Sequence, residues 1–125
     1  MELLPLERAA IETLVSREKP GYSELRRQLD SCRVTSREMT GVGFFTGLEV
    51  DPSAPPAPKS VGNPLGHGHR FPDDAYADVD GLEHGAGFVL WLAEGRLEAL
   101  EGFSYDGPWP DEVKTFAVRM APIQH

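Results

Sequence analysis

His67 and His69, which are separated by a single glycine, are the best candidates for a metal site in this sequence. Neutral imidazoles bind divalent metals, and Asp73, Asp74 or His84 would supply a third ligand. The pair lies in a glycine-rich stretch without a strand to hold both rings on one side, whereas metal sites are normally held by a rigid shell. We therefore expect two solvated loop histidines, with a metal site as the alternative.

Glu101 is predicted to lie in an unusual environment for a carboxylate. In the hairpin register predicted below, it faces Phe88 on the apolar side of the sheet. A carboxylate there needs a cationic or backbone partner, or its pKa rises. We expect an ion pair with a helix residue such as Arg26 or Arg27. A ligand site is the alternative, because perturbed carboxylates cluster at functional sites.

Catalytic motifs are not evident. Glu83 and His84 form an acid–base pair only if a turn brings them together, because adjacent residues on a strand point to opposite faces. Cys32 falls on an apolar helical stripe, where a thiol is expected to be inert. The sequence has no nucleophile elbow, phosphate loop or complete dinucleotide fingerprint. These observations favour a protein that is not an enzyme and uses no cofactor.

Aromatic residues are the other candidates for binding. Trp91, Trp109 and Tyr105 could line a ligand groove or an interface together with Glu101. Aromatic side chains beside a hairpin are more often core or dimer contacts, since they bury so much area.

Charge excludes some partners. The chain has 125 residues and a formal net charge of −8, all of it carried by residues 41–125. No cluster of Lys and Arg is present to displace counterions from nucleic acid or to bind an anionic membrane. A single cysteine excludes an intrachain disulfide, and the first residues lack the basic start and apolar run of a signal peptide. We expect a cytoplasmic protein.

The periodicity of apolar residues predicts one domain, 1–125, with an α+β fold. Residues 1–31 read as a hairpin of two amphipathic helices. Residues 32–120 read as a mainly antiparallel, meander-like sheet with the helices on one face. A Pro/Gly-rich loop at about 51–72 interrupts the sheet, and a stretch this long is usually functional or mobile. A short edge strand at 75–79 and a last strand at 113–120 complete the prediction.

The clearest local signal is a β-hairpin over 86–105 with Glu94-Gly95 as its turn. A two-residue turn pairs Ala93 with Arg96 and, in strict alternation, places Glu101 on the core face. The other face carries Val89 and Trp91 and is too apolar to be left in water. We expect this outer face to meet a protein partner or a second copy of the chain, which would make a homodimer.

The runs GFVLWLAEGRLEALEGFSYDGPWP and TGVGFFTGLEV resemble a group of small bacterial proteins. The shared pattern is a Gly-Phe-apolar strand, a glycine turn, Leu-Glu-Gly-aromatic and then Trp-Pro. The resemblance implies a bacterial, cytoplasmic, single-domain protein. It brings no activity and no functional residue with it.

These observations favour a non-enzymatic protein that binds another protein. An inhibitor or immunity-type protein that masks a basic partner is one version, argued from charge complementarity alone. The alternative is a protein that binds a small ligand or a divalent metal through the 51–74 loop. An enzyme with an unrecognised site comes third.

Overall fold

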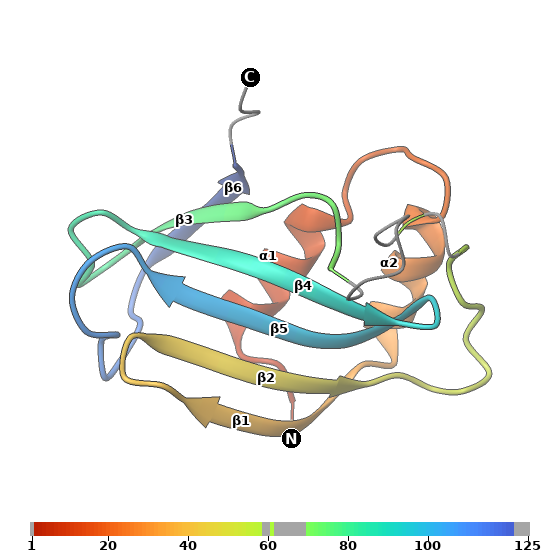
Figure 1. The fold of residues 1–125 in the computed structure, drawn as a ribbon, viewed down its shortest axis with the longest axis horizontal. Helices are drawn as coiled ribbons and strands as arrows, with labels where there is room; N and C mark the ends of the chain where they lie inside the picture. The colour runs from red at the N-terminus through yellow and green to blue at the C-terminus, as the bar shows by residue number, and fades with distance from the viewer. Residues whose placement is uncertain (1, 59–60, 62–69, 122–125) are drawn as a thin grey trace.

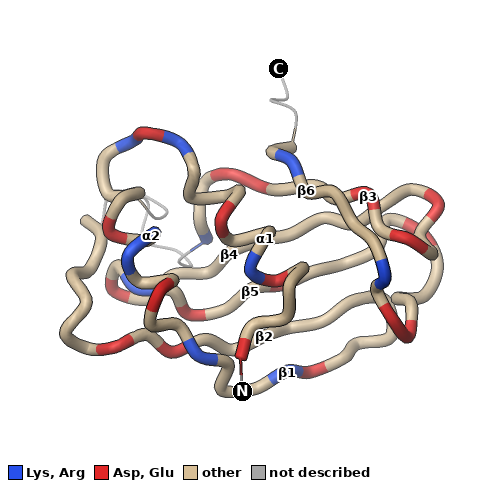
Figure 2. The backbone as a smooth tube through the Cα atoms, turned by 180° about the vertical axis from the view of Figure 1, so that it is seen from behind, with Lys and Arg blue, Asp and Glu red and all other residues tan. Residues whose placement is uncertain are grey.

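The computed structural model describes residues 2–58, 61 and 70–121, and it confirms the predicted α+β fold. Both helices lie on one face of an antiparallel sheet, and no described helix covers the opposite face, here called the open face (Figures 1 and 2). Neither described helix has the length and apolar character that crossing a bilayer requires. The elements are α1 (Pro5–Leu14), α2 (Tyr22–Asp30), β1 (Arg33–Met39), β2 (Gly43–Glu49), β3 (Ala75–Val79), β4 (Ala86–Ala93), β5 (Arg96–Ser104) and β6 (Phe116–Met120).

The strand order is β1-β2-β5-β4-β3-β6. The prediction that β3 is an edge strand is wrong, because β6 pairs along its outer side from Ala75–Met120 to Val79–Phe116. Asp78, the acidic residue of β3, forms an ion pair with Arg119 of β6.

The start of α1 is fixed by two local features. Pro5 occupies the first helical position, where its missing N–H costs nothing. Glu7 follows at the third position and accepts a hydrogen bond from the backbone N–H of Leu4 at 2.7 Å. The apolar stripe of the helix then lies against the sheet, with Leu6, Ala10, Ile11 and Leu14 all buried.

The hairpin forms as predicted at its turn and differs farther along. Ala93 pairs with Arg96, and Leu92 pairs with Leu97. A β-bulge then leaves one extra residue, Glu98, on β5. Every later side chain of β5 therefore changes face, so that Glu101 pairs with Val89 instead of lying over the core. The prediction that Glu101 faces Phe88 is wrong.

The turn at Glu94-Gly95 has a backbone conformation that favours some residue types over others, and this preference can be tested by substitution. Glu94 has a φ of 51° and Gly95 a φ of 79°, the signs that a type I′ turn requires. Asparagine tolerates this conformation better than glutamate, so Glu94→Asn is expected to stabilise the protein by about 0.5–1 kcal/mol in urea unfolding. The matched variant Gly95→Ala should destabilise it, because a Cβ there would lie 2.2 Å from the Ala57 carbonyl oxygen. A destabilising Glu94→Asn would contradict this account of the turn.

The described ends of the 51–72 segment are packed against the fold. The N–H of Ala57 donates to the Gly95 carbonyl, and the N–H of Phe71 donates to the Leu90 carbonyl, each at 2.8 Å. The Phe71 side chain is fully buried beside Tyr22. His67 and His69, expected to be solvated loop histidines with a metal site as the alternative, lie outside the described residues.

Candidate functional site

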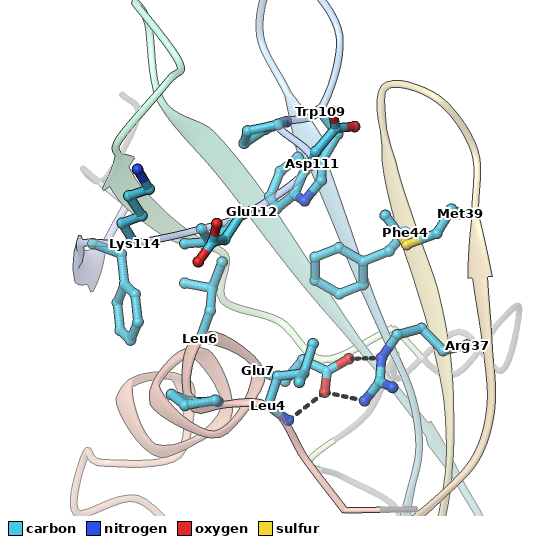
Figure 3. A pocket seen from close by; sticks show the side chains of 14 residues that line it. Leu4, Leu6, Glu7, Arg37, Met39, Phe44, Trp109, Asp111, Glu112 and Lys114 are labelled. Atoms are coloured by element: carbon cyan, nitrogen blue, oxygen red, sulfur yellow. Dashed lines mark hydrogen bonds and ion pairs between the residues drawn. The ribbon is translucent and has the colours of Figure 1, made fainter.

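A pocket opens between the N-terminus of α1, the helix-facing side of β1 and β2, and the segment 109–116 that leads into β6 (Figure 3). Its volume of about 470 Å³ lies within the range of small-molecule sites. The apolar part of its lining consists of Leu4, Pro5, Leu6, Met39, Phe44, Trp109, Pro110, Val113 and Phe116.

A buried ion pair forms one side of the pocket. Two nitrogens of the Arg37 guanidinium donate to the two carboxylate oxygens of Glu7, at 2.9 and 2.7 Å. The Glu7 carboxylate also accepts from the Thr46 hydroxyl and from the Leu4 N–H, and Glu7 is only 1% exposed. Burial alone would raise the pKa of Glu7. The hydrogen bonds from Arg37, Thr46 and Leu4 outweigh it and hold that pKa below its ordinary value.

Aromatic rings form the facing wall. Trp109 meets Phe44 edge to face, with ring centroids 5.3 Å apart, and Phe44 continues into the core against Phe88. The Phe44 ring lies against Gly102 of β5, where a Cβ would come within 2.4 Å of a ring carbon. The backbone N–H of Trp109 donates to the Gly41 carbonyl at 2.9 Å and so ties the segment to the β1–β2 turn. The wall is thus positioned by two separate hairpins.

Charged residues stand at the mouth. Asp111, Glu112 and Lys114 are exposed, and Figure 3 shows the Glu112 carboxylate between Trp109 and Leu6. Neither Glu112 nor Lys114 forms a hydrogen bond or ion pair with another described residue. The site therefore offers an apolar interior, an internally neutralised ion pair and a carboxylate at the entrance.

The four binding candidates named from the sequence divide between the two faces of the sheet. Trp109 lines the pocket. Trp91 and Glu101 belong to the open face, because they pair with Ala99 and Val89 across the hairpin. Tyr105 is 55% exposed and stacks on Tyr76 of β3, at a centroid distance of 6.0 Å. The structure therefore does not bring these four residues together.

Several aromatic side chains lie on the open face of the sheet. Phe103 packs edge to face against Tyr105, and the Arg119 guanidinium lies 4.4 Å from the centre of the Tyr76 ring. Phe45 on β2 is 40% exposed. A partner protein or a second copy on this face stays a prediction.

The expected ion pair of Glu101 with Arg26 or Arg27 is not formed. Arg26 instead donates to the carbonyl oxygens of Val15 and Arg17, at 2.6 and 3.1 Å, and lies near Glu18. Since α2 packs on the other face of the sheet, Arg26 and Glu101 are separated by the sheet itself.

His84 lies close to the carboxylate of Asp106, which belongs to another loop. Its Nε2 lies 3.8 Å from the Asp106 Oδ2, and Glu83 completes a group whose ligand atoms lie within 4.8 Å of one another. All three side chains are exposed.

Cys32 is half-buried, and burial raises the pKa of its thiol to about 11, which disfavours the reactive thiolate.

Sequence reasoning missed most of the pocket. A local signal for Glu7 was present, because a glutamate two residues after a helix-starting proline is placed to reach back to the N-cap. Its partners Arg37 and Thr46 come from two strands, and no local pattern joins them to α1.

Comparisons with protein-family models, curated proteins and solved structures find no match to this chain.

Proposed function

We propose that this protein is a non-enzymatic binding protein whose pocket beside Trp109 holds the apolar part of a small ligand. The observation that carries the proposal is a cavity of about 470 Å³ with aromatic and aliphatic walls. Small-molecule sites combine such walls with a few placed polar groups. Here the Glu7–Arg37 pair and the Glu112 carboxylate are those groups.

The chemistry of the lining supports binding over catalysis. None of the described residues that line the pocket is Ser, Thr, Cys or His, the side chains most often used as nucleophile or general base. The one buried carboxylate, Glu7, already accepts hydrogen bonds from Arg37, Thr46 and Leu4. A group locked in this way is suited to shaping a site and poorly suited to moving a proton.

The proposal is tested by titrating 2-phenylethanol, a small neutral aromatic alcohol, into isotopically labelled protein followed by NMR. We expect shifts at Leu6, Phe44 and the Trp109 indole N–H. Trp109→Ala should weaken binding about tenfold or more, because a large aromatic contact is worth roughly 1.5–3 kcal/mol. The control Trp91→Phe alters the open face and should leave binding unchanged.

Two results would overturn the proposal. One is a set of shifts confined to the open face around Phe45 and Tyr105. The other is a Trp109→Ala variant that binds like the natural protein while thermal unfolding shows that it is folded. A folded variant is expected, because Trp109 is only partly buried at the edge of the core.

A further inference from the structure

We infer that the ligand of this pocket is a small organic cation, in which an ammonium group is attached to an aromatic or aliphatic body. The inference rests on the proposed function and adds the charge of the ligand. It is argued from the charges and rings around the cavity.

The interior of the pocket carries no net charge. The Arg37 guanidinium is held by Glu7 through two hydrogen bonds, and the Glu7 carboxylate is in turn fully buried. An anionic ligand would have to compete with this carboxylate for Arg37. Such an exchange would leave the Glu7 charge buried without its main partner, which is costly.

The entrance favours positive charge. Asp111 and Glu112 are consecutive and exposed, and both line the pocket; Figure 3 shows the Glu112 carboxylate near Leu6. Lys114 is the one basic residue of this segment, and its amine is directed away from the Glu7–Arg37 pair in the same view. The mouth therefore carries two carboxylates against one amine, which favours a ligand ammonium group there.

The walls suit the same ligand. Trp109 has the aromatic ring with the strongest attraction for cations, and Phe44 stands beside it at 5.3 Å. The net charge of −8 adds a long-range attraction for cations and a repulsion for anions. The Glu112 carboxylate, the aromatic rings and the negative charge of the whole protein therefore all favour a cationic ligand.

The test compares three probes with the same benzyl body: 2-phenylethylammonium, 2-phenylethanol and phenylacetate. Affinities are measured by the NMR titration at low salt. We expect the ammonium probe to bind about threefold to tenfold more tightly than the alcohol, the range typical of an exposed cation–π contact with one ion pair. Phenylacetate should bind more weakly than the alcohol.

Variants locate the charge preference. Glu112→Gln should remove most of the advantage of the ammonium probe and leave the affinity for the alcohol within about twofold, because only an exposed charge is lost. The matched control Glu98→Gln removes the same charge from β5, away from the pocket, and should keep the preference. Lys114→Gln should preserve or increase it.

The outcomes separate the two proposals. Equal affinity for the ammonium and alcohol probes overturns the cation inference and leaves the binding pocket standing. Tightest binding of phenylacetate also overturns it, because Arg37 would then act as an anion anchor. Absence of binding by all three probes overturns the proposed function together with the inference.

Discussion

Replacing Glu7 with alanine is expected to lower the free energy of unfolding by about 3–5 kcal/mol, the usual cost of removing one partner from a buried ion pair. The side chain is 1% exposed and accepts hydrogen bonds from Arg37, Thr46 and Leu4. Its loss leaves the guanidinium without its carboxylate, the hydroxyl without its acceptor and the helix without its N-terminal bond. Urea unfolding followed by circular dichroism measures the change.

Glu12 provides the matched control on the same helix. Its side chain is 58% exposed, and its ion pair with Arg8 spans 4.0 Å. Glu12→Ala should therefore change the free energy of unfolding by less than about 1 kcal/mol, as expected for an exposed pair. If Glu7→Ala costs no more than Glu12→Ala, the network around Glu7 does not stabilise the fold.

The contribution of Glu7 should also depend on pH. Its pKa is lowered in the folded protein, so its ionised form stabilises the fold at pH values above the pKa of the unfolded chain. That stabilisation is lost as pH falls from about 5 through the folded pKa, since an unperturbed glutamate titrates near pH 4.3. The difference in stability between the natural protein and Glu7→Gln should therefore shrink in acid. A difference independent of pH would contradict the role given to the charge.

Local patterns were sufficient to predict the elements that are built locally. The 3.6-residue stripe of Leu14 and its neighbours, and the turn at Glu94-Gly95, each depend on residues close in sequence. The bulge at Glu98 has no such signature, because Leu97, Ala99 and Leu100 leave both faces of β5 apolar. One extra residue then reversed the predicted face of Glu101.

The pocket could not be predicted from the sequence because its residues come from segments that are far apart in the chain. Trp109 is a binding candidate from its residue type, whereas its partner Phe44 is not among the sequence-based candidates. Their contact joins segments 65 residues apart and depends on the pairing of β2 with β5, which no local pattern specifies. The same holds for Glu7 and Arg37, which are 30 residues apart.

A second buried polar residue, Gln28 of α2, should be as important to the fold as Glu7. Its side-chain amide donates to the Gly95 carbonyl at 2.9 Å and to the Pro55 carbonyl at 3.1 Å. Its oxygen accepts from the Leu97 N–H at 3.0 Å, and the residue is fully buried. One side chain therefore joins the helical layer to the turn of the central hairpin and to the loop that follows β2.

Gln28→Ala is expected to lower the free energy of unfolding by about 3–5 kcal/mol, because buried backbone groups lose their partners and a cavity forms. Arg27→Ala, at the exposed neighbouring position, should change it by no more than about 0.5 kcal/mol. Urea unfolding of both variants makes the comparison. A cost below that of a typical surface substitution would show that the three hydrogen bonds contribute nothing.

Gln28→Glu distinguishes lost hydrogen bonds from lost volume, because it keeps the shape and the acceptor for Leu97. It replaces the two donated hydrogen bonds with a carboxylate that faces the carbonyl oxygens of Gly95 and Pro55. Burial and this repulsion should raise the pKa of the new group in the folded state. The variant should therefore lose stability as pH rises above the pKa of the unfolded chain and be least stable above the raised pKa of the folded state. Its stability relative to the natural protein should recover as pH falls and the acid regains one donor. A deficit that stays constant between about pH 7 and pH 4 would mean that the position responds to shape alone.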